Sequence, residues 1–212
     1  TLDGDSEGEI QYENFNACKA EFEIRGFNVH PGEGKDTMIN ASLVAIEINN
    51  CLPSMETPRG TEDYEGFYHL ISMQGEVGEA KLNYIVRDHD KNGFEERKKT
   101  LRLIEKNLNA KWGEGTVTLK ITDQYLNMKE IVEEHMHLID HAKKACEAAG
   151  VAPLILPIRG GTDGCQLSFK GLPCPNLGTG GHAFHGPYEH ISVEGMEKSV
   201  ELLLALIQEY TK

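Results

Sequence analysis

Alternating apolar and polar positions mark the first 124 residues as rich in β-strands. Residues 9–29 alternate in the way that half-buried strands do. Three further strands are predicted at residues 66–73, 79–87 and 116–123. Helical spacing covers residues 37–50 and 93–110. In the first of these helices one face carries Met38, Ala41, Ala45 and Ile48. This order predicts an α+β sandwich, an antiparallel sheet with two helices on one face.

The pattern changes from about Tyr125 onward, where helical and apolar strand-like segments alternate. Helices are predicted at residues 137–149 and 193–210, the second with Ser192 as its N-cap. Short strands are expected at residues 154–158 and 174–179, followed by the glycine-rich loops 159–164 and 180–186. Such alternation is typical of an α/β layer, whose ligand sites lie at the carboxyl ends of strands. The fold class expected for the chain is therefore α/β plus α+β.

Charge and cysteine content narrow the range of functions. The 212 residues include 34 acidic and 21 basic side chains, which gives a net charge of −13. Such a surface repels phosphate backbones and anionic lipids, so we expect neither a nucleic-acid nor a membrane partner. Five cysteines without a CxxC pair indicate a reducing compartment, and the acidic N-terminus is not a targeting peptide. We expect a cytoplasmic protein.

Two motifs that imitate metal sites have simpler interpretations. The segment Asp88-His-Asp-Lys-Asn-Gly93 resembles the start of a calcium-binding loop, but Lys99 stands where a bidentate Glu is required. It predicts a strand-to-helix turn with an acidic N-cap. His137 and His141 lie four apart on a helix, but Leu138 replaces the Glu of a zinc protease motif. A polar helix face is the better interpretation of this pair.

Other polar residues are candidates for chemistry at loops. His30 precedes Pro31 in a turn, where it is either an oxyanion donor or part of a capped surface turn. Arg159 opens the first glycine-rich loop and has the fork geometry that binds carboxylates. Metal ligands are available in Asp3 and in the imidazoles of His182 and His185. Each loop alone is equally consistent with an ordinary tight turn, but together they indicate a divided metal site.

At these residues the sequence resembles a known family. The segments that carry the resemblance include Asn28-Val-His-Pro-Gly32, Ile158-Arg-Gly-Gly-Thr-Asp-Gly164 and Gly180-Gly-His-Ala-Phe-His-Gly186. In this order they are similar to the distal half of the peptidase T family, aminotripeptidases among the dinuclear-zinc exopeptidases related to carboxypeptidase G. The resemblance covers nearly the whole chain. It implies a zinc-dependent aminopeptidase that releases the N-terminal residue from tripeptides.

The resemblance also implies roles for individual residues and segments. Asp3 matches a ligand of one of two zinc ions, and His185 matches a ligand of the other. His30 matches the histidine that polarises the scissile carbonyl. Substrate binding is implied for Arg87, Arg159 and, at the cleft wall, His69. Residues 15–124 would be a lid domain that also forms a homodimer. The catalytic domain would contain residues 1–14 and the C-terminal part of its α/β layer, residues 125–212.

The chain departs from the family pattern in one large respect. The remaining zinc ligands and the Glu general base lie upstream in the family and are absent from these 212 residues. We therefore expect a C-terminal fragment of a longer enzyme, inactive by itself. Two alternatives stay open: a non-catalytic binding or dimerisation fragment, and a dipeptidase or carboxypeptidase of the same superfamily.

Overall fold

The chain divides into two compact units. The computed structural model describes residues 1–211. One unit is formed by Asn16–Tyr125, here called the sheet unit. The other combines Thr1–Phe15 with the chain from Leu126 onward, here called the flanking unit. Each is described separately below.

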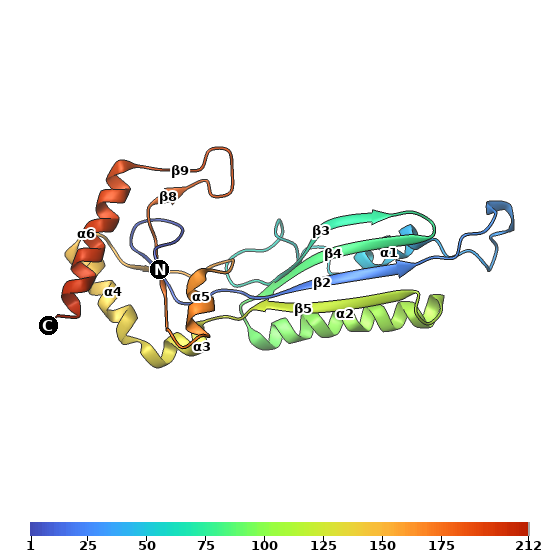
Figure 1. Ribbon diagram of the computed structural model, residues 1–212, viewed down its shortest axis with the longest axis horizontal. Helices are drawn as coiled ribbons and strands as arrows, with labels where there is room; N and C mark the ends of the chain where they lie inside the picture. The colour runs from blue at the N-terminus through green and yellow to red at the C-terminus, as the bar shows by residue number, and fades with distance from the viewer. Residues whose placement is uncertain (212) are drawn as a thin grey trace. The chain divides into compact units, whose positions relative to one another are not determined.

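The sheet unit is built on one four-stranded antiparallel sheet (Figure 1). Its strands are β2 (Asn16–Arg25), β3 (Phe67–Gly75), β4 (Glu79–Asp88) and β5 (Val117–Tyr125), in the order β3-β4-β2-β5. Strand β2 pairs with β4 along its entire length, from Asn16 opposite Asp88 to Arg25 opposite Glu79. The antiparallel sheet predicted from the alternating pattern is confirmed.

Two helices share a single hydrophobic core with this sheet. They are α1 (Ala41–Asn50) and α2 (Lys91–Trp112). Alternate side chains of β2, among them Phe22 and Ile24, are buried in this core together with Val44 of α1 and Leu101 of α2. Both helices therefore cover the same face of the sheet, because side chains two apart along a strand point to one side.

The starts of the two helices are fixed by side-chain caps. The N–H of Gly93 donates to Asp90 Oδ1 at 2.6 Å, which confirms the acidic N-cap predicted at this turn. Helix α1 begins later than the predicted residue 37. Asn40 is its N-cap, and the backbones of Phe27 and Ile39 exchange two hydrogen bonds that keep the preceding segment extended. Met38 consequently lies outside the helix.

The flanking unit contains a small mixed sheet. Strand β1 (Glu9–Gln11) lies between β6 (Leu154–Ile155), which is parallel to it, and β7 (Asn176–Leu177), which is antiparallel. Strands β6 and β7 are shorter than the predicted strands at residues 154–158 and 174–179. Pro157 and Pro175 lie within those stretches and have no N–H to donate to a neighbouring strand.

Helices and turns complete the flanking unit. These elements are α3 (Lys129–Val132), η2 (Glu133–His135), α4 (His137–Ala148), α5 (Asp163–Ser168), a hairpin of β8 (Gly181–His182) and β9 (His190–Ile191), and α6 (Val193–Glu209). Helix α4 packs against α6. The predicted cap of α6 is confirmed, because the N–H of Gly195 donates to Ser192 Oγ at 2.9 Å. No helix within residues 1–211 has the length and apolar character needed to cross a membrane.

Candidate functional site

His30 lies at the start of a single helical turn in the sheet unit. The turn is η1 (Pro31–Glu33), and the exposed His30 is its N-cap. The backbone N–H of Gly32 donates to His30 Nδ1 at 3.2 Å. The structure therefore confirms the capped turn, in which the ring uses Nδ1, and the role of this histidine as an oxyanion donor stays a prediction.

Arg87 and His69 lie on the face of the sheet that the helices do not cover. Arg87 is opposite Phe67 in the β3–β4 ladder, and His69 is opposite Ile85. The two candidates therefore occupy diagonal positions on one face. The Arg87 guanidinium donates to Gln124 Oε1 at 3.2 Å and lies 5.0 Å from the centre of the Tyr125 ring. Burial lowers the pKa of Arg87 from its ordinary value, though an arginine stays protonated at neutral pH.

Asp3 lies in an exposed N-terminal segment that runs beside β7. Its N–H donates to the carbonyl of Leu177 at 3.1 Å, and the N–H of Gly180 donates to the carbonyl of Asp5 at 2.8 Å. Thr179 adds two hydrogen bonds to the Gly4 carbonyl, from its N–H and from its hydroxyl. The fold therefore holds the Asp3 segment against the strand that leads into the loop containing His185.

His185 is held in an uncommon backbone conformation. Its φ is +59°, and Ala183, two residues earlier, has a φ of +56°. Residues other than glycine rarely adopt this left-handed region. The N–H of His185 donates to Glu189 Oε2 at 3.0 Å, and its side chain is exposed. The other imidazole of this loop, His182, is paired across the hairpin with His190, with the ring centres 5.3 Å apart.

The loop that begins with Arg159 is anchored to the segment after β1. The N–H of Ile158 donates to the Glu13 carbonyl at 2.8 Å, and the N–H of Phe15 donates to the Gly160 carbonyl at 3.2 Å. The Arg159 guanidinium lies 5.1 Å from the centre of the Phe15 ring. This contact orients the cation over an aromatic face, where it is favoured electrostatically.

The candidate residues supply only part of a metal-binding site. The carboxylate of Asp3 and the imidazole of His185 are both suitable zinc donors, but a zinc site normally uses at least three protein ligands. Within residues 1–211 there is no group of three or more His, Cys, Asp or Glu side chains placed to hold a metal ion. The donor types fit zinc, and their number does not complete a site.

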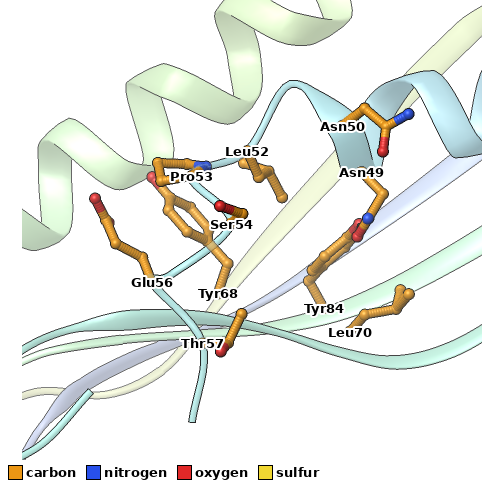
Figure 2. A pocket seen from close by; sticks show the side chains of 10 residues that line it. All are labelled: Asn49, Asn50, Leu52, Pro53, Ser54, Glu56, Thr57, Tyr68, Leu70 and Tyr84. Atoms are coloured by element: carbon orange, nitrogen blue, oxygen red, sulfur yellow. The ribbon is translucent and has the colours of Figure 1, made fainter. Parts of the chain in front are cut away.

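Sequence reasoning did not identify a cavity in the sheet unit. It has a volume of about 260 Å³ and lies between the end of α1, the following loop and the sheet (Figure 2). The Tyr84 hydroxyl donates to Asn49 Oδ1 at 3.0 Å, and burial raises the pKa of Tyr84 to about 12. The cavity is lined by Asn49, Asn50, Leu52, Pro53, Ser54, Glu56, Thr57, Tyr68, Leu70 and Tyr84. None of these residues matched a motif, because they come from three separate segments of the chain.

An ion-pair network centred on the nearly buried Arg97 supports one wall of this cavity. Arg97 Nε donates to Asp88 Oδ2 at 2.8 Å, and the same guanidinium pairs with Glu56. It also lies 5.0 Å from the centre of the Tyr68 ring. Asp88, which the sequence placed only in a turn, is therefore a structural partner of α2.

Comparison with known proteins finds similarity to a peptidase dimerisation domain and to proteins named peptidase T. Residues 12–116 match the sequence model described as the peptidase dimerisation domain. The chain is 51% identical over all 212 residues to a protein named peptidase T from Caldanaerobacter subterraneus subsp. tengcongensis, and covers 52% of that protein. The chain thus spans about half the length of the curated relatives it matches.

Solved structures agree with this fold. The chain superposes on an aminopeptidase, PepT, from Bacillus cereus with a TM-score of 0.84 and 23% identity, covering 100% of this chain and 56% of that one. It also superposes on a Bacillus subtilis protein described as a dinuclear metal-binding peptidase of the M20 family. That match has a TM-score of 0.66 and 16% identity, and covers 95% of this chain and 53% of that one.

Proposed function

We propose that the chain is part of a zinc-dependent aminopeptidase that releases the N-terminal residue from tripeptides. The chain is homologous to proteins named peptidase T and covers about half of their length. The observation that carries this proposal is the 51% sequence identity to a peptidase T, in an alignment that covers the entire chain. The acidic surface and the free cysteines fit a cytoplasmic enzyme acting on small peptides.

In this proposal Asp3 and His185 each supply one zinc ligand, to different ions of a pair. Two bound zinc ions would lower the pKa of a bridging water and so provide hydroxide at neutral pH. The segment contacts around Leu177 and Gly180 support this role, because they hold Asp3 beside the strand that precedes the His185 loop. The remaining ligands and the general base would come from the other half of the longer protein.

Four side chains are assigned to the substrate: one hydrogen-bond donor to the reacting carbonyl, and three side chains that bind the rest of the peptide. His30 donates a hydrogen bond to the oxyanion that forms as the scissile carbonyl is attacked, a contribution typically worth about 100- to 1000-fold in rate. Arg87 and Arg159 bind the peptide carboxylate or backbone, and His69 lines the cleft. The shared sheet face of Arg87 and His69 supports placing them in one subsite.

The domain assignment follows from the same family. We assign residues 15–124 as a lid domain that also forms a homodimer, and residues 1–14 with 125–212 as the C-terminal part of the catalytic α/β domain. The match of residues 12–116 to a dimerisation domain supports the homodimer. Sedimentation equilibrium of the chain tests it: a mass of twice the monomer is expected, and a monomer at all concentrations contradicts it.

The central experiment uses the full-length protein from the same source. Replacing His185 with Ala is expected to remove about one zinc ion per subunit and nearly all tripeptide hydrolysis. His182→Ala is the matched control, an imidazole three residues away that this proposal does not assign to zinc. Unchanged zinc content and unchanged turnover in H185A would refute the assignment. Tripeptides with blocked and free termini, together with dipeptides, separate an aminotripeptidase from a dipeptidase or a carboxypeptidase.

One observation favours a second candidate, a non-catalytic binding or dimerisation fragment. The part of the chain that the structure describes has no group of three metal-binding side chains. The native polypeptide distinguishes the two: a product of about twice 212 residues supports the enzyme, and a native product of this length supports the fragment. Under either candidate the isolated chain is expected to show no tripeptide hydrolysis.

A further inference from the structure

We infer that the backbone amide of Gly32 is a positioning group that fixes the His30 ring in its Nε2–H tautomer. The inference concerns the proton on one imidazole. Its use in catalysis rests on the proposed function, whereas the tautomer itself does not. In this view the Pro31–Gly32 turn both shapes the backbone and determines which His30 nitrogen carries the proton.

The tautomer follows from which groups at this turn can donate a hydrogen bond and which can accept one. A neutral imidazole has one N–H donor and one bare nitrogen acceptor. The Gly32 N–H can only donate, and it is directed at His30 Nδ1 at 3.2 Å. Nδ1 must therefore be the bare nitrogen, which places the proton on Nε2. The contact is the N-cap of turn η1 and joins residues only two apart in the chain.

No other group in this turn selects the opposite tautomer. The charged residues of the loop are Glu33, Lys35 and Asp36. The His30 ring makes one hydrogen bond within residues 1–211, the one from Gly32, and no ion pair with these three side chains. A carboxylate at Nδ1 would hold a proton there, and the structure has none in that position. The exposed side of the ring is thus an N–H donor, the polarity that an oxygen with growing negative charge requires.

Glycine at position 32 leaves the space that this contact needs. A methyl group there would lie 3.3 Å from His30 Nδ1 and 3.4 Å from Cε1, which is closer than side chains normally approach. The backbone of Gly32 is not in the left-handed region, so alanine would cause crowding of the ring without backbone strain. Gly34 offers a control in the same turn, because a methyl group there would meet Met38 and the Pro31 carbonyl oxygen and would not meet the His30 ring.

The test is nitrogen-15 NMR of the imidazole rings in the 212-residue chain, at a pH where histidines are neutral. Wild-type His30 is expected to show a bare Nδ1 and a protonated Nε2. His69, exposed and without a hydrogen bond from its ring, is the internal reference for a free mixture of tautomers. Gly32→Ala is expected to shift His30 toward that mixture, and Gly34→Ala is expected to leave it as in the wild type.

Three outcomes would overturn the inference: a wild-type His30 with the same mixture as His69, a proton on Nδ1, or a G32A spectrum identical to the wild type. Activity is measured separately in the full-length enzyme. There G32A is expected to lower kcat severalfold, in proportion to the fraction of rings in the wrong tautomer, with G34A unchanged. If the NMR result holds while kcat does not change, the tautomer assignment stands and the proposed role of His30 in catalysis fails.

Discussion

Arg97 donates from Nε to Asp88 Oδ2 across 2.8 Å, and both side chains are nearly excluded from solvent, at 14% and 11% exposure. The hydrogen bonds to Asp88 and Glu56 outweigh the effect of burial and raise the pKa of Arg97. Because Asp88 ends β4 and Arg97 belongs to α2, this pair joins the helix to the sheet. Glu56 extends the same network to the loop after α1.

Replacing Arg97 with Met is expected to lower the free energy of unfolding of the sheet unit by about 3 kcal/mol. The cost arises because Asp88 would stay buried without a cationic partner. The chain contains a single tryptophan, Trp112 at the end of α2, so its fluorescence during urea denaturation reports on this unit. The control is Lys99→Met on the same helix, whose pair with Glu96 is exposed. Equal urea midpoints for the two variants would contradict the structural role of the buried pair.

The sheet unit is expected to lose stability between pH 10 and pH 12 through Tyr84. Burial raises the pKa of this phenol to about 12, whereas in an unfolded chain it titrates near 10. As the pH rises, the unfolded state releases this proton first, so the free energy of unfolding falls by up to about 1.4 kcal/mol per pH unit. Urea midpoints should decline less steeply in Tyr84→Phe, and as steeply as the wild type in the exposed control Tyr188→Phe.

Thiol labelling is expected to distinguish Cys51 from the buried cysteines. Cys51 is exposed, whereas Cys18 is fully buried. Burial, followed by the charge of Asp123, raises the pKa of Cys18 to about 12, so its reactive thiolate is scarce at pH 8. A chromogenic disulfide reagent should therefore give a fast phase that is smaller by one thiol in Cys51→Ser, with the half-exposed Cys174 reacting next. All five thiols should react in denaturant, and rapid labelling of Cys18 in the folded chain is the result that counts against this assignment.

Asn14 is expected to be essential for the flanking unit. Its buried side chain donates to the carbonyls of Phe15 and Leu126, at 2.8 and 3.1 Å, and accepts from the N–H of Met128 at 2.8 Å. Asn14→Ala would remove the acceptor of the buried Met128 N–H, at a cost of about 1–3 kcal/mol. Hydrogen exchange at the Met128 amide should accelerate on the order of 100-fold. Asn50→Ala, which removes an exposed amide, should leave that rate unchanged.

The sheet unit could be predicted from the sequence because its signal is local. Residues such as Phe22 and Ile24 alternate with charged neighbours, and a strand with one buried face requires that alternation. The start of α1 could not be located in this way. Met38 continues the helical spacing, but the pairing of Phe27 with Ile39 and the cap at Asn40 decide where the helix begins. Those contacts join residues twelve positions apart, and they do not produce a periodic pattern of apolar residues in the sequence.

The candidate site shows a similar division. Loop residues such as His30 and His185 could be singled out as candidates because the glycine and proline around them are typical of turns. The wall formed by Arg97, Asp88 and Glu56 could not be predicted. These residues belong to a helix, a strand and a loop, and each taken alone is an ordinary charged surface residue. Arg97 and Asp88 are nearly excluded from solvent, whereas the Glu56 side chain is 41% exposed.

The left-handed backbone at Ala183 and His185 has a consequence for how this loop tolerates change. Side chains with a Cβ pay about 1–2 kcal/mol in that region, and glycine would relieve the steric conflict at either position. The point at which the His185 imidazole leaves the loop therefore depends on a backbone conformation that costs free energy at two positions.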